Sequence, residues 1–177
     1  MTTQHIAAAL QRVEAVLQRR PETGIHDDAP ATARWEGNSR VTTTHANGTT
    51  LATDMPTELG GTGDQVTPGW LFRAGVASCA ATSIALAAAA EGVALALLEV
   101  RVTSRSDARG LLGMADADGA IVGAGPREMQ LLVRIAADAV APQRLRTLVE
   151  RGCRCSPIPN AVTHATPLAL HIEVEAA

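Results

Sequence analysis

The feature that most constrains the fold is a long apolar segment in the middle of the chain, PGWLFRAGVASCAATSIALAAAAEG. Proline is tolerated in the first turn of a helix and glycine commonly follows the last turn, so the segment predicts one helix from Pro68 to Glu91 that ends at Gly92. Its only charged residues are Arg73 and Glu91. A helix that is apolar on nearly every side is usually buried on several sides. We therefore expect it to pack against a sheet or against its own copy in a dimer.

Short strands are predicted on both sides of this helix. The segments TARWEG, SRVTTTHA and TTLATD precede it, and Asn47-Gly48 between the last two is a strong hairpin signal. After the helix, ALALLEVRVTSRSD and REMQLLVRIAAD alternate between apolar and polar residues, as half-buried strands do. A short strand is expected at 111–114, and PLALHIEVEA is expected to close the chain as a strand. The apolar residues of that last strand share one face: Leu168, Leu170, Ile172 and Val174.

Two more helices complete the predicted set. Residues 3 to 19 are amphipathic, and APQRLRTLVERGC predicts a helix with Pro142 in its first turn. The segment RRPETGIHDDAPA has no periodicity and is predicted to be a linker. Because the strands come in antiparallel groups rather than alternating with helices, the order of elements predicts the α+β class.

Composition excludes several classes of function. The net charge of −3 carries no long run of either sign, so we expect no nucleic-acid surface. All fifteen basic residues are arginine, which rules out a Schiff-base or phosphate-loop lysine. Three cysteines are an odd number and favour a reduced, cytoplasmic setting over a disulfide framework. No signal peptide is expected, and the longest uninterrupted apolar run, around residues 84 to 90, is too short for a membrane span.

The cysteines are the residues on which chemistry could depend. Cys79 lies in the long helix, where it is either a small buried hydrophobe or a reactive thiol. Cys153 and Cys155 lie at the end of the second long helix with Arg151 and Arg154 beside them, and positive neighbours favour a thiolate. A C-x-C pair without further ligands is too small for a structural zinc site. No Ser-His-Asp pattern or glycine-rich phosphate loop is present, so we expect neither a metal nor a cofactor.

At these residues the chain resembles the OsmC/Ohr family of small bacterial proteins, which includes thiol-dependent hydroperoxide reductases. The resemblance rests on ARWEG, on GGTGDQVTPGWLFRAGVASCAATSIALAAAAEGVAL and on LRTLVERGCRCSPIPNAVTHATPLALHIEVE. It runs from about residue 31 to 175, which divides the chain into an N-terminal helix and linker at 1–30 and an OsmC-like domain at 31–177. The resemblance implies an intertwined two-fold homodimer with antiparallel sheets around a long buried central helix.

The resemblance also implies roles for the cysteines. Cys79 matches the family's attacking thiol, and a second cysteine after the last helix would resolve the sulfenic acid as a disulfide. Cys155 or Cys153 is the candidate for that second thiol, although strict register places Ser156 at the resolving position. Phe72, Arg73 and Ser156 are the expected binding residues around the thiol.

Two features of the family's pattern are missing from this chain. The glutamate at the helix start falls on Gly69, and the loop LATDMPTELGGTGDQVTP holds no arginine. Arg73 is a poor substitute within the helix, and Arg40 or an arginine of a second subunit could take this role.

Two hypotheses follow. In the first, the chain is an OsmC-like hydroperoxide reductase that uses Cys79 as the attacking thiol, and an external dithiol re-reduces the disulfide. In the second, it is a non-catalytic dimer that binds a small hydrophobic ligand in the cleft beside Cys79. The missing Arg and Glu favour the second hypothesis, and the retained thiols favour the first.

Overall fold

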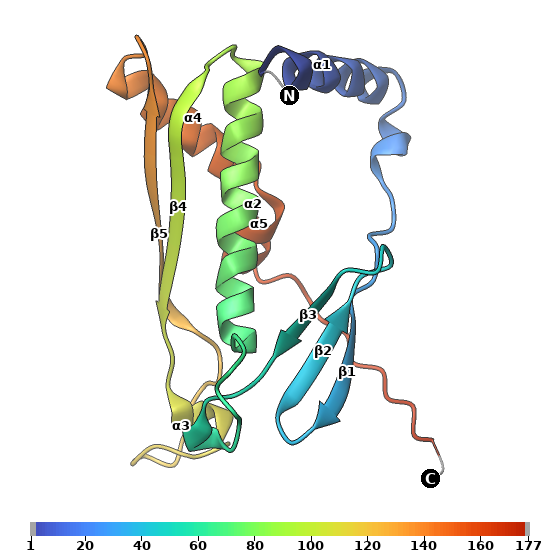
Figure 1. The fold of residues 1–177 in the computed structure, drawn as a ribbon, viewed down its shortest axis with the longest axis vertical. Coiled ribbons are helices and arrows are strands. Elements are labelled where there is room, and N and C mark those ends of the chain that lie inside the picture. The colour runs from blue at the N-terminus through green and yellow to red at the C-terminus, as the bar shows by residue number, and fades with distance from the viewer. Residues whose placement is uncertain (1–2, 176–177) are drawn as a thin grey trace.

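The computed structural model describes residues 3–175, and Figure 1 shows a long central helix between two separate antiparallel sheets. One sheet has the order β1-β2-β3, and the other pairs β4 with β5. This is the predicted α+β arrangement. The elements in chain order are α1 (Thr3–Arg19), η1 (Pro21–Gly24), β1 (Thr32–Gly37), β2 (Arg40–Thr44), β3 (Thr50–Thr53), η2 (Thr57–Leu59), α2 (Pro68–Ala90), β4 (Leu95–Arg105), α3 (Ala108–Leu111), β5 (Arg127–Ala137), α4 (Pro142–Arg154) and α5 (Pro157–Thr163).

The central helix α2 begins and ends where its sequence predicts. The Thr67 hydroxyl accepts a hydrogen bond from the Trp70 backbone N–H at 3.2 Å, which satisfies one free donor of the first turn. Glu91 caps the other end, and Gly92 follows with φ of +68°, a conformation that favours glycine. By length and composition alone α2 is apolar enough to cross a membrane. Within the chain, only 22% of its most apolar 18-residue stretch is buried. Much of its apolar surface therefore remains uncovered.

The core lies between α2, α4 and the β4–β5 pair. Ile84 and Ala88 of α2 pack with Leu145 and Leu148 of α4, and Val93 completes the cluster. Side chains from the inner face of the β4–β5 pair pack against this cluster: Leu98, Val100, Val133 and Ile135. Leu98 pairs with Ile135 and Val100 with Val133, so the predicted alternation of these strands is confirmed.

Two helices in the core approach each other closely at one glycine. A Cβ atom added to Gly152 of α4 would lie 2.7 Å from the Cα of Ile84, closer than packed carbon atoms allow. Only glycine permits this contact without a shift of the helices. Because the contact sets α4 against α2, it also positions the turn that follows α4.

A polar network holds the loop between β3 and α2 against the first hairpin. Asp54 is buried, and its carboxylate accepts hydrogen bonds from the Ser39 hydroxyl at 2.6 Å and from the Thr62 hydroxyl at 2.7 Å. These bonds hold the pKa of Asp54 well below its usual range. Arg40 pairs with both Asp54 and Asp64, and hydrogen bonds from Arg40 and Thr62 lower the pKa of Asp64 to about 2.

Two predicted strands are corrected by the structure, and one helix was not predicted. Of the segment expected to form a strand at 111–114, Leu111 instead ends the short helix α3, whose start is capped by Asp107, and residues 112–113 form a turn. The segment SPIPNAV, for which no helix was predicted, contains most of helix α5, because proline at the first helical position favours a helix start.

The predicted C-terminal strand is absent over residues 167–175, and Ala176 lies outside the described residues. This segment runs away from the body without pairing (Figure 1). Its alternating apolar side chains are 75% to 97% exposed: Leu168, Leu170, Ile172 and Val174. A strand needs a neighbouring edge with which to hydrogen-bond, and this segment pairs with no strand in the described part of the chain.

Candidate functional site

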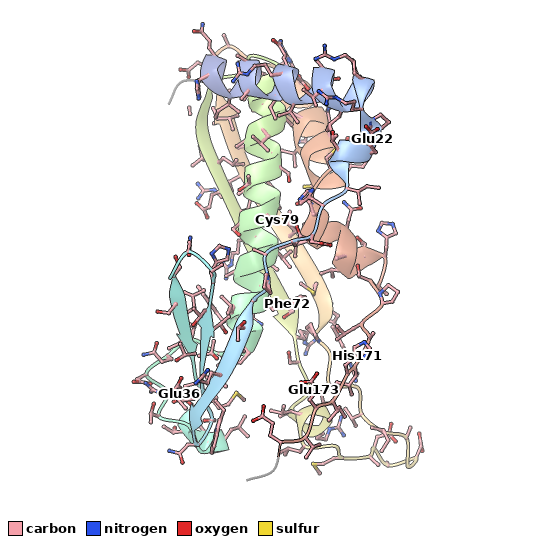
Figure 2. All side chains as sticks on the ribbon, turned by 90° about the vertical axis from the view of Figure 1, so that its right-hand side faces the viewer. Glu22, Glu36, Phe72, Cys79, His171 and Glu173 are labelled. Carbon is pink, nitrogen blue, oxygen red and sulfur yellow. The ribbon has the colours of Figure 1, made fainter. Side chains whose placement is uncertain are left out.

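Cys79 lies at mid-length of α2 and is half-buried (Figure 2). The Ser156 hydroxyl, just before α5, donates a hydrogen bond to Cys79 Sγ at 3.2 Å. The Ile158 backbone N–H, in the first turn of α5, donates a second one at 3.4 Å. Ser156 itself is fully buried. Two donors aimed at one sulfur stabilise the negative charge that a reacting thiol develops.

The turn that carries these donors is held from both sides. The side-chain amide of Asn160 donates to the carbonyl oxygens of Arg154 and Ser156, both at 2.8 Å. The backbone N–H of Ser156 donates to the Cys153 carbonyl at 3.2 Å. These bonds join the end of α4 to the start of α5, so Ser156 faces Cys79 in a fixed position.

The other two cysteines lie in different surroundings, and all three are free of disulfides. Cys153 is half-buried against the core cluster, and burial raises the pKa of its thiol. Cys155 is exposed and lines a cavity of about 600 Å³ between α1, α2 and α4. Among the described residues, neither thiol forms a hydrogen bond with Cys79, whereas Ser156 does.

The remaining residues expected around the thiol are engaged elsewhere or open to solvent. Arg73 Nη1 donates to the Ser104 hydroxyl of β4 at 3.4 Å. Phe72 is 40% exposed and lies nearer the start of α2 than Cys79 (Figure 2). Arg40 is paired with Asp54 and Asp64. Within residues 3–175, no arginine donates a hydrogen bond to Cys79, and no three His, Cys, Asp or Glu side chains are grouped as metal ligands would be.

Sequence reasoning missed two parts of this site, the Ile158 N–H and the Asn160 side chain. A signal for both was present in SPIPN, where a serine precedes a proline that can begin a helix. Interpreted as a helix start, that pattern would have placed free backbone N–H groups and a polar side chain beside Ser156.

The chain belongs to the OsmC-like protein family, whose sequence pattern matches residues 61–171. The matched region contains the helix with Cys79 and the turn with Ser156, and α1 lies outside it. A comparison with curated proteins finds no match.

Solved structures share the fold at low sequence identity. An OsmC-like protein from Mycoplasma pneumoniae superposes with a TM-score of 0.63 at 18% identity, over 78% of this chain and 89% of that one. An OsmC-like protein of unknown function from Vibrio cholerae gives 0.61 at 12% identity, over 77% and 94%. An organic hydroperoxide resistance protein OsmC from Legionella pneumophila gives 0.54 at 21% identity, over 78% and 90%. These likenesses establish the OsmC-like fold.

Proposed function

We propose that this chain is a thiol-dependent hydroperoxide reductase that protects against peroxide stress, with Cys79 as the attacking thiol. The observation that carries the proposal is the half-buried sulfur of Cys79, held by two hydrogen-bond donors from a separate element. The name of the Legionella pneumophila structure, an organic hydroperoxide resistance protein, supports an organic substrate. A reducing compartment such as the cytoplasm would keep the thiol reduced.

The proposed step balances without a cofactor. The Cys79 thiolate attacks the terminal oxygen of a hydroperoxide, the O–O bond breaks, and the departing alkoxide takes a proton to become an alcohol. Cys79 is oxidised to a sulfenic acid, and the peroxide is reduced by two electrons. The donors from Ser156 and Ile158 stabilise the thiolate and orient it, in the absence of a contacting arginine.

A second candidate function is the binding of a small hydrophobic ligand without turnover. It is favoured by the lack of an arginine or a glutamate in hydrogen-bond contact with Cys79 in the described region. The cavity between α1, α2 and α4 begins one helical turn beyond Cys79, at Ser83, and its lining is mostly apolar. A volume of about 600 Å³ lies within the range of small-molecule sites.

The same proposal includes a homodimer. The exposed apolar surface of α2, with Trp70 and Phe72 at 49% and 40% exposure, needs a partner to exclude water. The exposed alternation at 168–174 has the pattern of a strand that lacks an edge. A second copy of the chain would supply a surface that covers α2 and a strand edge for residues 168–174. Deletion of residues 167–177 should therefore shift the protein from dimer to monomer in analytical ultracentrifugation, and a dimer of unchanged affinity would contradict this role.

The activity is tested with the full-length chain, cumene hydroperoxide and dihydrolipoate as the external dithiol. Cys79→Ser should lower peroxide consumption by about a thousandfold, because a serine hydroxyl is a poor nucleophile at neutral pH. Cys155→Ala provides a matched control for the loss of a thiol. Equal rates for wild type and Cys79→Ser would refute the reductase and leave ligand binding, which isothermal titration with decanoate and decanol would then examine.

A further inference from the structure

We infer that Ser156 occupies the place of a resolving cysteine, so that the Cys79 sulfenic acid is reduced directly by a low-molecular-weight thiol through a mixed disulfide. The inference rests on the proposed function and completes it with a single-thiol cycle, in place of the internal disulfide that the family resemblance implies. It names the chemical class of the reductant, a small soluble monothiol, where the sequence pattern suggested a second cysteine and a dithiol.

The first argument is the identity of the side chain that lies beside Cys79 Sγ, where a resolving thiol would have to be. A resolving thiol must come within bonding distance of Cys79 Sγ, about 2 Å in the final disulfide. Among the described residues, the side chain that hydrogen-bonds to the sulfur is that of Ser156, whose hydroxyl lies 3.2 Å from it and which is fully buried. A serine hydroxyl cannot form a disulfide, but it can donate a hydrogen bond to the thiolate and then to the sulfenate oxygen.

The second argument is the position of Cys155. Its side chain is exposed and lines the cavity between α1, α2 and α4. Its backbone N–H donates to the carbonyls of Arg151 and Gly152, both at 3.2 Å. To reach Cys79, Cys155 would have to break these bonds and displace Ser156. The two bonds from the Asn160 amide oppose that movement.

The third argument concerns Cys153. This residue packs against the core cluster between α2, α4 and the β4–β5 sheet, and within the described residues it forms no hydrogen bond with Cys79. Gly152, its neighbour, is fixed by the close approach to Ile84, so α4 cannot rotate Cys153 toward Cys79 without separating the two helices. Movement of either candidate thiol toward the sulfenic acid is therefore opposed by contacts that the fold needs.

The reduction then proceeds in two balanced steps. A thiol R′SH attacks the sulfur of Cys79–SOH, which gives Cys79–S–SR′ and releases water. A second R′SH attacks the mixed disulfide, which releases R′S–SR′ and restores the Cys79 thiol. Each turnover thus oxidises two molecules of small thiol and reduces one hydroperoxide. The half-buried position of Cys79 leaves an approach for a small thiol.

The test treats the full-length chain with one equivalent of cumene hydroperoxide and follows intact mass and free thiols. Without added thiol, we expect one added oxygen atom, trapped by dimedone at Cys79, and two of the three thiols still titratable. With glutathione, we expect one glutathione bound at Cys79, and then its release by a second molecule. A Cys79–Cys155 or Cys79–Cys153 disulfide would overturn the inference alone. No oxidation of Cys79 would overturn the proposed function and the inference with it.

A gain-of-function variant tests the same geometry in the opposite direction. Ser156→Cys should form an intramolecular disulfide with Cys79 after one equivalent of peroxide, which leaves two of its four thiols titratable. Cys155→Ala in the same background should still form this disulfide, which then leaves one of three thiols titratable. If Ser156→Cys, folded as judged by circular dichroism, oxidises Cys79 but forms no such disulfide, Ser156 does not hold the resolving position and the inference fails.

Discussion

Two segments near the end of the described chain, α4 and residues 164–175, use apolar residues in opposite ways. In α4, Leu145 and Leu148 are buried in the core, and the turn after the helix is held by hydrogen bonds at Cys79 and Asn160. In the segment 164–175, Leu168 and Val174 are exposed to solvent at 97% and 90%. The comparison shows that an apolar pattern becomes structure only where the chain supplies a complementary surface. The predictions below test this contrast.

The largest expected effect is the loss of stability when a core leucine is truncated, compared with truncation of an exposed leucine. Leu148→Ala removes a side chain that is 1% exposed and should lower the free energy of unfolding by about 2–5 kcal/mol. Leu168→Ala should change the stability of the folded subunit by less than about 0.5 kcal/mol. Urea unfolding at low protein concentration measures both. Equal losses for the two variants would mean that the C-terminal segment packs within the subunit after all.

The contact between α2 and α4 is tested by adding one methyl group. Gly152→Ala places a Cβ atom against Ile84 and should destabilise the fold by about 1–3 kcal/mol, because the helices must separate. Gly75→Ala on α2 is the matched control, since an added Cβ there meets no atom within 4 Å. Alanine is the better helix former, so Gly75→Ala should be neutral or stabilising in the same urea titration. A neutral Gly152→Ala would contradict the close packing.

The anchored turn is tested through the reactivity of the thiol. Ser156→Ala removes the donor at 3.2 Å and should slow alkylation of Cys79 by iodoacetamide about tenfold, the effect of roughly 1.4 kcal/mol. Ser156→Thr keeps the hydroxyl and should recover part of the rate, which a purely structural role would not predict. Peptide mass spectrometry assigns the alkylated cysteine. An unchanged rate in Ser156→Ala would show that the hydrogen bond does not act on the thiol.

The smallest expected effect is a pH dependence of stability. It concerns the loop between β3 and α2, which Asp54 and Asp64 hold against the first hairpin. Both carboxyls have a folded-state pKa below the unfolded value, with Asp64 at about 2. Their contribution to stability is therefore complete above the unfolded pKa of about 4 and is lost as pH falls toward about 2. The melting temperature should decline in that window. Asp54→Asn should weaken the decline, and an identical decline in wild type and variant would exclude Asp54 as a cause.

Local patterns were sufficient to predict most elements from the sequence. The central helix was predicted to within one residue, because Pro68, Gly92 and the apolar run act within the segment itself. The alternation of apolar and polar residues in β4 and β5 correctly predicted two strands, and these pair with each other within the chain. The exposed C-terminal segment has an equally clear alternation, but a strand is defined by hydrogen bonds to a neighbour that its own sequence does not contain.

The site was predictable only in part. Cys79 was identified by the family pattern, whereas its contact with Ser156 joins residues 77 positions apart. From the sequence CRCSP, both Cys153 and Cys155 were candidates for the resolving thiol. Which side chain faces Cys79 depends on the rotation of α4 against α2, and that rotation depends on one glycine contact.

By itself, the sequence determined the class of the fold, the central apolar helix and the family, because periodicity, helix signals and ordered motifs are local properties of the chain. The tertiary structure alone decided which neighbour Cys79 has. The packing of Gly152 on Ile84 and the hydrogen bonds of Asn160 position Ser156, whose hydroxyl donates to the sulfur. Cys155 and Ser156 are adjacent in that turn, so a shift of one residue would place a thiol instead of a hydroxyl beside Cys79. Close packing between segments that are distant in the sequence determines which of the two side chains lies there.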